Sequence, residues 1–255
     1  MELLRIQHLK KVYSTRLGSQ QFTALSDVSF EVAQGEFVAI MGASGSGKTT
    51  LLNLIASLDK PTAGDVYLDG RNLKEISNWE ISAFRRNNLG FVFQEFNLLD
   101  SFSVRDNILL PLVLSNMPVK QMEDRLVPVA KRLELGGLLN KFPHEISGGE
   151  KQRTAVARAI ITDPKLVLAD EPTGSLDSRS SGQLLEIFQD INAQGQTIVV
   201  VSHSSMVASH AGRVIFIKDG RLFSQVYRGE STRREFFDKI IATLAVLADG
   251  GVDIG

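Results

Sequence analysis

A glycine-rich run that follows a short apolar segment constrains this chain more than any other feature. Residues 42–49 read Gly-Ala-Ser-Gly-Ser-Gly-Lys-Thr, match the pattern G-x-x-x-x-G-K-[ST], and follow the apolar run Glu36–Met41. Glycines let successive backbone N–H groups point into one concavity, and the start of the next helix adds positive partial charge. The run predicts a strand, a phosphate-binding loop and a helix in succession.

The side chains of this loop have separate expected roles. Lys48 is long enough to reach the β- and γ-phosphates of a nucleotide, and the hydroxyl of Thr49 suits a magnesium ion. The remaining predicted contacts with the nucleotide are Gly42, Ser44, Gly45, Gly47 and Thr50.

Two further apolar runs predict strands of the same sheet. Lys165–Ala169 and Thr197–Ser202 are almost continuously apolar, as strands covered on both faces are. Helical patterns over Lys48–Leu58 and Ser180–Gln194 separate the runs, and a strand–helix–strand order favours parallel crossovers. The predicted fold is therefore α/β with a mainly parallel core sheet.

Two regions have other patterns. Apolar residues alternate with polar ones on both sides of the polar stretch Ser14–Gln21, as Leu4 and Ile6 show before it and Val28 and Phe30 after it. This alternation predicts an N-terminal antiparallel β subdomain with a loop between its strands. Residues 95–160 are mainly helical in pattern, and their prolines, at 111, 118, 128 and 143, are expected to separate short helices. We expect this region to be an inserted α-helical subdomain.

Polar side chains follow the predicted strands at their carboxyl ends, where open parallel sheets bind ligands. Asp170 and Glu171 follow the second apolar run, His203 follows the third, and Gln94 follows another strand-like run. Asp170 can hold magnesium through water, Glu171 can orient or deprotonate an attacking water, and His203 can donate to the γ-phosphate. The amide of Gln94 can contact both metal and water, so we interpret it as a γ-phosphate sensor.

Ser147 and the two glycines after it predict a further anion site. Ser147 suits the N-cap of the helical pattern that follows, and Gly148 and Gly149 would expose backbone N–H groups at its start. As a pattern, the run Ile-Ser-Gly-Gly-Glu over 146–150 resembles the LSGGQ signature of ATP-binding cassette (ABC) ATPases.

The other motifs match that family in order over nearly the whole chain. The loop at 42–49 corresponds to its Walker A motif, Gln94 to its Q-loop, residues 166–170 to its Walker B motif, and His203 to its H-loop. The resemblance implies a P-loop NTPase fold that binds ATP and Mg²⁺. It also implies that Glu171, His203 and Gln94 are catalytic, and that Thr49, Gln94 and Asp170 hold the metal.

The resemblance further implies that the working unit is a homodimer. In this family the signature of one subunit completes the ATP site of the other, so Ser147, Gly148 and Gly149 are expected to contact nucleotide in trans. Asp177, in the D-loop-like run Ser175-Leu-Asp, is expected at the dimer seam, and Tyr13 is expected to stack on adenine.

Glu150 stands where the signature usually has glutamine. A signature that ends in glutamate resembles that of the exporters of macrolides, lipoproteins and antimicrobial peptides. The stretch from Tyr227 to Ile241 is similar to the tail of bacitracin and lantibiotic resistance exporters, although it also reads as an amphipathic helix that packs on the cassette. We therefore expect a cassette at 1–226, a C-terminal helical extension at 227–255, and a role in antimicrobial peptide export.

Composition limits the partners. The formal net charge is -1 and there is no cysteine, which disfavours nucleic acid binding and excludes disulfides and thiolate metal sites. No apolar run approaches the roughly 20 residues that cross a bilayer. The resemblance therefore implies a peripheral location on the cytoplasmic face of the membrane, beside a separate permease.

Two other functions fit parts of the pattern. An ABC ATPase of the cell-division type, which pairs with a membrane protein but moves no substrate, has the same motifs. A GTPase fits less well, because the only Asn-Lys pair, Asn140-Lys141, is followed by Phe142-Pro143 and reaches no aspartate at the guanine-reading spacing.

Overall fold

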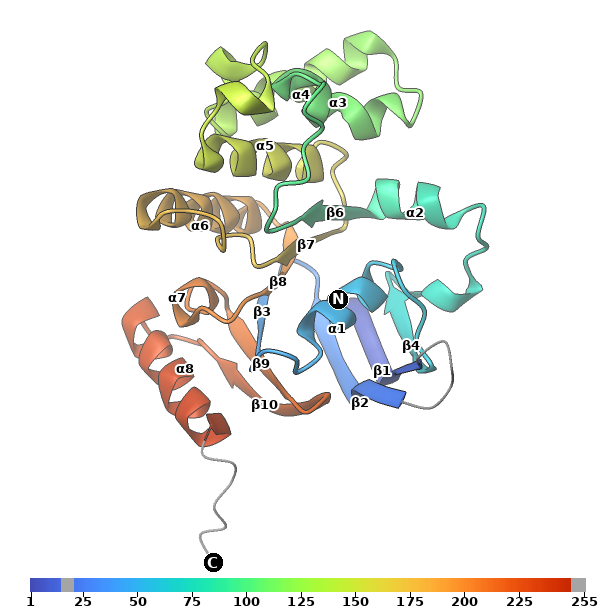
Figure 1. The fold of residues 1–255 in the computed structure, drawn as a ribbon, viewed down its shortest axis with the longest axis vertical. Coiled ribbons are helices and arrows are strands. Elements are labelled where there is room, and N and C mark those ends of the chain that lie inside the picture. The colour runs from blue at the N-terminus through green and yellow to red at the C-terminus, as the bar shows by residue number, and fades with distance from the viewer. Residues whose placement is uncertain (15–20, 249–255) are drawn as a thin grey trace, which may run out of the picture. The chain divides into compact units, whose positions relative to one another are not determined.

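The computed structural model describes residues 1–14 and 21–248 and divides into two compact units (Figure 1). The first unit is Met1–Ile76 with Val199–Gly255, and the second is Ser77–Ile198. Most of the predicted loop at Ser14–Gln21, and the last seven residues of the chain, lie outside the described residues. Within the described residues no helix is long and apolar enough to cross a membrane.

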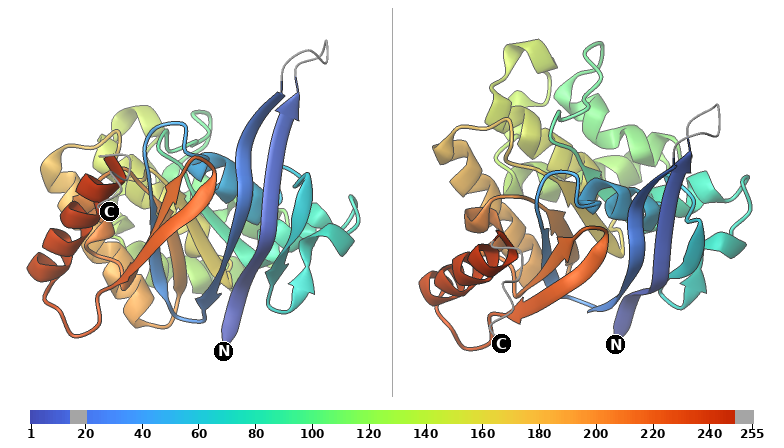
Figure 2. Two further views of the ribbon diagram at one scale, coloured as in Figure 1. Left: turned by 90° about the horizontal axis from the view of Figure 1, so that it is seen from below. Right: turned by 60° about the horizontal axis from the view of Figure 1, so that its bottom comes forward.

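The first unit contains the predicted antiparallel subdomain. Its strands lie in the order β5 (Arg71–Asn72), β4 (Ala63–Leu68), β1 (Glu2–Ser14), β2 (Gln21–Ala33), β10 (Arg221–Tyr227), β9 (Arg213–Lys218) and β3 (Phe37–Met41). The long strands β1 and β2 run antiparallel side by side (Figure 2), with Ile6 opposite Phe30. Their alternating apolar side chains are buried. The period-2 pattern therefore predicted this subdomain correctly.

Strand β3 carries the phosphate loop. It pairs parallel with β9, and all five of its residues are buried, as its continuous apolar run predicted. Helix α1 (Lys48–Ile55) follows the loop but ends three residues before the predicted Leu58. The reason is local, because Ser57 has a φ of 55°, a left-handed conformation that does not continue a helix.

The second unit holds the parallel pair β6 (Leu89–Val92) and β7 (Leu166–Asp170), and β8 (Thr197–Val201) begins in it. Its helices are α2 (Ile81–Asn88), α3 (Val104–Val113), α4 (Val119–Arg132), α5 (Gly148–Ile160) and α6 (Ser178–Ala193), with the short 3-10 turns η2 (Gly136–Leu138) and η3 (Pro143–Glu145). Helix α5 packs against both β6 and α3. Residues 95–160 are thus mainly helical.

The expectation that all four prolines separate helices was half wrong. Pro118 is the N-cap of α4 and Pro143 begins η3, but Pro111 and Pro128 lie inside α3 and α4. An interior proline removes one backbone hydrogen bond and crowds the preceding turn. Each helix continues because its buried face extends beyond the proline, with Leu112 in α3 as an example.

Helix α8 (Arg233–Ala248) packs on α7 (Ser205–Ala208) and β10 in the first unit (Figure 2). Lys218 Nζ donates a hydrogen bond of 2.9 Å to the carbonyl of Leu247 near the end of α8. At its start, Arg233 Nη1 lies 3.3 Å from His210 Nε2. Burial, together with Arg233 and Arg228, lowers the pKa of His210 to about 4. The folded state therefore resists protonation of His210, and this packing loses stability as the pH falls from 6.5 towards 4.

Truncating the buried face of α8 should destabilise the protein. Phe236 is fully buried, and Phe236→Ala should lower the free energy of unfolding by about 3–5 kcal/mol through lost transfer energy and a cavity. Ile241, which is 44% exposed on the same helix, is the matched control, and Ile241→Ala should change it by about 0.5 kcal/mol or less. Denaturant unfolding of both variants measures the difference, and equal losses would show that α8 is not packed as described.

The turn between β3 and α1 depends on a close approach of two backbones. Gly47 has a φ of 100°, and a Cβ there would collide with the carbonyl oxygen of Ala24 on β2. Gly45 also has a positive φ, 78°, but a Cβ there would meet nothing within 4 Å. Gly47 is thus required for conformation and for space, and Gly45 for conformation alone.

This difference predicts unequal effects of the same substitution. Gly45→Ala should cost about 1–2 kcal/mol of stability from the left-handed backbone alone. Gly47→Ala should cost clearly more, because β2 or the loop must also move. Thermal unfolding of the two variants without nucleotide tests this order, and a Gly47→Ala protein as stable as Gly45→Ala would contradict it.

Candidate functional site

The phosphate loop of the first unit surrounds the head of its own lysine. Lys48 is the first residue of α1 and is buried, and its Nζ donates hydrogen bonds of 2.9 Å to the carbonyls of Gly42 and Ala43. The hydroxyl of Ser46 is buried and makes no hydrogen bond within the described residues. An ammonium group and an unsatisfied hydroxyl in one glycine-rich loop suit the acceptor oxygens of a phosphate.

Most of the other loop residues are at least partly open to solvent, and Gly42 is the buried exception. Ser44, Gly45 and Thr49 are exposed, and Thr50 is half-buried. Gly42 is buried, and a Cβ there would collide with the carbonyl oxygen of Ile217 on β9. The glycine at 42 therefore lets β3 and β9 stay close at the end of the parallel pair.

His203 lies in the same unit and follows β8. The backbone N–H of its neighbour, Ser202, donates a hydrogen bond of 3.1 Å to the carbonyl of Ile40 on β3. His203 itself is exposed. The structure therefore places His203 beside the carboxyl end of β3, where the phosphate loop begins.

Tyr13 is held by Lys11 of its own strand and by Asp59, which follows α1. Its hydroxyl donates a hydrogen bond of 2.9 Å to Asp59, and Lys11 Nζ lies 4.7 Å from the centre of its ring. Lys11 Nζ also lies 2.7 Å from Asp59 Oδ1, so the three side chains form one cluster. Burial raises the pKa of the Tyr13 hydroxyl, whereas hydrogen bonds from Lys11 and Tyr13 outweigh burial and lower the pKa of Asp59. Tyr13 is 41% exposed, so part of its ring can contact a planar ligand.

The second unit brings Gln94, Asp170 and Glu171 to one edge of a parallel pair. Val92 of β6 is opposite Ala169 of β7, so the residues that follow both strands emerge together. A Cβ at Gly174 would lie 2.9 Å from Cδ of Gln94, which shows how closely the Gln94 side chain covers the turn after Glu171. Glu171 has a φ of 44°, and its carbonyl accepts a 2.9 Å hydrogen bond from the N–H of Gly174. A strained residue at this position is typical of a functional turn.

Ser147 is the N-cap of α5, as the sequence predicted. Its hydroxyl accepts from the N–H of Glu150 at 3.3 Å, and the Glu150 carboxylate accepts from the N–H of Ser147 at 2.7 Å. The bonds that this carboxylate accepts from the N–H and from the hydroxyl of Ser147 lower the pKa of Glu150. The residue that departs from the usual signature therefore completes a capping box that fixes the start of the helix.

The two signature glycines differ in what surrounds them. A Cβ at Gly149 would lie 2.9 Å from Ser180 Oγ, so the start of α5 approaches the first turn of α6 closely. A Cβ at Gly148 would meet only ordinary neighbours, at 3.8 Å or more. Packing among the described residues therefore favours a glycine at 149 and makes no such demand at 148.

Asp177 is the N-cap of α6. Its carboxylate accepts hydrogen bonds of 2.9 Å from the N–H groups of Arg179 and Ser180 and one of 2.7 Å from the Ser180 hydroxyl. The bonds from Ser180 are the main reason that the pKa of Asp177 is low. Its side chain is thus fixed at the end of the turn that follows Glu171.

One residue of the site was missed in the sequence. Gln152 on α5 is fully buried and contacts the backbone of both loops, at Phe93 and at Pro172. The sequence carried a signal, because Gln152 recurs at helical spacing with the apolar Ala155, Val156 and Ala159. A polar residue on the buried face of a helix needs a partner.

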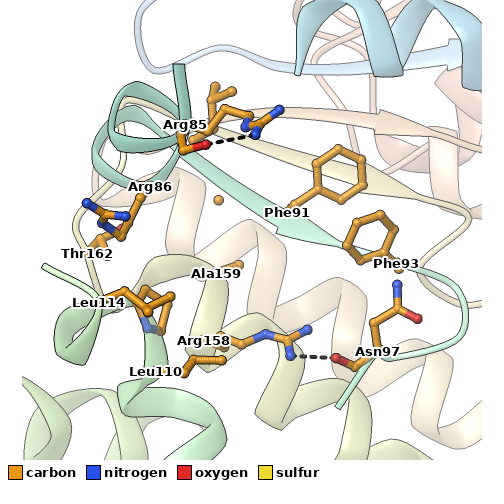
Figure 3. A pocket seen from close by; sticks show the side chains of 14 residues that line it. Arg85, Arg86, Phe91, Phe93, Asn97, Leu110, Leu114, Arg158, Ala159 and Thr162 are labelled. Carbon is orange, nitrogen blue, oxygen red and sulfur yellow. Dashed lines mark hydrogen bonds between the residues drawn. The ribbon is translucent and has the colours of Figure 1, made fainter. Parts of the chain in front are cut away.

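The second unit also contains a groove of about 480 Å³ (Figure 3). Its lining combines apolar side chains such as Phe91, Leu110 and Leu114 with the cations Arg85, Arg86 and Arg158. Arg158 Nη1 donates a 2.6 Å hydrogen bond to the carbonyl of Asn97, drawn as a dashed line in Figure 3. The groove therefore borders the segment that follows Gln94.

Comparison with known proteins agrees with these motifs. The ABC transporter family profile matches residues 25–174. The bacitracin export ATP-binding protein BceA of Halalkalibacterium halodurans is 45% identical over 99% of this chain and 98% of its own length. The macrolide export ATP-binding/permease protein MacB of Paracoccus denitrificans is 40% identical over 86% of this chain, which corresponds to 33% of that longer protein.

A solved structure extends the agreement to the fold. The dimeric, post-hydrolysis state of the ATP-binding cassette MJ0796 bound to ADP and Pi has a TM-score of 0.80 and 37% identity, covering 88% of this chain and 98% of that one. In this chain, that fold carries the glycine loop, the two strand-end carboxylates and the capped signature helix. The chain belongs to the ABC transporter family and is one of its ATP-binding, ATP-hydrolysing subunits.

Proposed function

We propose that this subunit drives the export of antimicrobial peptides or related amphipathic molecules through a separate membrane permease. The proposed substrate class rests on the match to BceA over almost the full length of both chains, because that protein is named for the export of bacitracin. The capped Ile-Ser-Gly-Gly-Glu signature supports the same subfamily.

In the proposed site, the loop at 42–49 binds the phosphates of ATP. Lys48 would exchange its carbonyl partners for the β- and γ-phosphate oxygens, and the unsatisfied Ser46 hydroxyl would gain an acceptor. His203 would donate a hydrogen bond to the γ-phosphate from beside the end of β3. The exposed part of the Tyr13 ring would stack on adenine.

The residues proposed to hold Mg²⁺ suit a hard cation. Thr49, Gln94 and Asp170 offer a hydroxyl, an amide oxygen and a carboxylate, and magnesium prefers oxygen ligands. Within residues 1–14 and 21–248 no group of three or more His, Cys, Asp or Glu side chains could hold a metal. The proposed ligand set is a mixed one of oxygen atoms, which the nucleotide would complete. When bound, magnesium would neutralise charge on the β- and γ-phosphates.

Glu171 is the proposed general base. It follows the carboxyl end of β7, and its turn is held by hydrogen bonds and by the packing of Gln94 on Gly174. In this role its carboxylate orients the attacking water and accepts its proton as the water oxygen bonds to the γ-phosphorus, while the bond from that phosphorus to the bridging oxygen breaks and ADP leaves.

A second copy of the chain is proposed to complete each site. The N–H groups at the start of α5 point out of a fixed helix terminus, and no contact with residues 1–14 or 21–248 calls for a glycine at 148. Both features suit a phosphate bound by Ser147, Gly148 and Gly149 of the partner copy. Asp177, fixed as the cap of α6, would lie at the seam of this dimer.

The permease is proposed to dock in the groove of the second unit. The apolar and cationic lining suits an amphipathic segment that carries apolar and acidic side chains. MacB is named as an ATP-binding/permease protein, so in this relative the ATP-binding part and the permease belong to one polypeptide. Docking would hold this subunit at the cytoplasmic face of the membrane.

Removing the base should separate binding from hydrolysis. Glu171→Gln should lower the rate of ATP hydrolysis by about 10²–10⁴-fold, the usual contribution of a general base, while ATP still binds and holds the dimer closed. Lys48→Ala should instead weaken nucleotide binding, measured by titration with a fluorescent ATP analogue. Parental turnover in Glu171→Gln would contradict the assignment of the base.

The substrate class is tested in cells. A strain that lacks this subunit should become more sensitive to cell-wall-targeting peptides, and the parental chain should restore resistance while Glu171→Gln should not. The measurement is the minimal inhibitory concentration over a panel that includes bacitracin. Unchanged sensitivity across the panel would count against peptide export and would leave the ATPase assignment intact.

A further inference from the structure

Gln152 is a fully buried polar side chain whose hydrogen bonds are directed at two loops. Its Nε2 donates to the carbonyl of Phe93 at 3.1 Å and to the carbonyl of Pro172 at 2.6 Å. Its Oε1 is buried and makes no hydrogen bond within the described residues. A buried amide that is only half satisfied adds little net stability, since the unpaired oxygen has lost its water.

The two acceptors are next to the two residues with proposed roles in hydrolysis. Phe93 precedes Gln94, and Pro172 follows Glu171. One rigid amide group thus fixes the backbone of both loops at adjacent positions. The Glu171 turn is held in addition by the Gly174 N–H bond to its carbonyl and by the Gln94 side chain over Gly174. Because Glu171 has a positive φ, its conformation depends on such neighbours.

The segment after Gln94 is held from the same helix. Arg158, six residues beyond Gln152 on α5, donates to the carbonyl of Phe96 at 2.9 Å and to that of Asn97 at 2.6 Å. Phe96 and Asn97 both have positive φ, 58° and 50°, so this stretch is also fixed in a strained form. Arg158 and Asn97 line the groove (Figure 3). Helix α5 therefore connects the groove, the loop of Gln94 and the turn of Glu171 by hydrogen bonds to backbone carbonyls.

We propose that Gln152 is a positioning residue for ATP hydrolysis. It ties the turn of Glu171 to the loop of Gln94, so that the carboxylate reaches its working position only when that loop is in place. The proposal rests on the proposed role of Glu171 as the base. It also gives a path by which a partner that displaces Arg158 or Asn97 in the groove alters the rate of hydrolysis.

The test replaces Gln152 by methionine, which has nearly the same length and volume and no donor. Gln196 is a matched control in the same unit, because its Nε2 also donates to two backbone carbonyls, those of Pro164 at 2.9 Å and Thr197 at 3.3 Å. Those carbonyls lie at the amino ends of β7 and β8, away from the carboxyl-end residues of the site. Each variant loses one side-chain amide that donates to two backbone carbonyls. Only the amide of Gln152 bonds to a residue next to Glu171.

The steady-state kinetics of ATP hydrolysis and the melting temperature are measured for both full-length variants. Gln152→Met should lower kcat about tenfold or more, since small misplacement of a catalytic group is costly, and should change KM for ATP by less than about twofold. Gln196→Met should keep the parental kcat. A kcat in Gln152→Met equal to that of Gln196→Met would overturn the proposal, as would a loss confined to KM.

A second variant covers the case in which Gln152→Met does not fold. Gln152→Glu keeps the shape, but its carboxyl group has at most one proton to donate and cannot bond both carbonyls, so kcat should again fall while KM stays within about twofold. A parental kcat in this variant would also overturn the proposal. Failure of the base assignment is recognised separately, because Glu171→Gln would then turn over normally whatever Gln152 does.

Discussion

Parallel strand pairing is the constraint on which the site depends. In a parallel pair both strands end at the same edge, and each unit uses this property once. In the first unit β3 and β9 end where the phosphate loop begins, and His203 is placed there by the bond between Ser202 and Ile40. In the second unit β6 and β7 deliver Gln94, Asp170 and Glu171 to one edge. These strand-end groups are therefore brought to their edges by the sheet.

Close backbone contact then shapes the loops at these edges. Gly42 and Gly47 lie against carbonyl oxygens of β9 and β2, so the lack of a side chain lets the phosphate loop pack directly on these strands. In the second unit Gly174 lies under Gln94, and Gly149 lies against Ser180. Glycines at these positions serve packing, while those at 45 and 148 have space around them. In one glycine-rich motif, therefore, some glycines permit close packing and others do not serve packing. The structural contacts are needed to tell them apart.

Helix capping accommodates the glutamate of the signature. Glu150 is the third residue of α5, where its carboxylate accepts from the backbone of Ser147, and Asp177 caps α6 in a similar way. Negative charge at these positions also complements the positive end of the helix. The acidic residue in the signature is consequently part of a stable helix start, which agrees with the ATPase assignment of the chain.

Much of the site was predictable because its signals are local. The G-x-x-x-x-G-K-T run, the continuous apolar strands and the Ser147 cap are each read within a few residues, and the structure places all three as expected. The interior prolines were not predictable, because the burial that tolerates Pro111 and Pro128 comes from neighbouring elements.

The sequence by itself determined the fold class, the phosphate loop and the strand-end residues, because hydrophobic periodicity and short motifs are recognised from residues that are neighbours along the chain. Only the tertiary structure decided that Tyr13 is held by Asp59 and that Gln152 joins the loops of Gln94 and Glu171. These contacts join residues that are about 20 to 60 positions apart. The physical reason is that a side-chain hydrogen bond depends on where packing brings its partner, and no local pattern records that position.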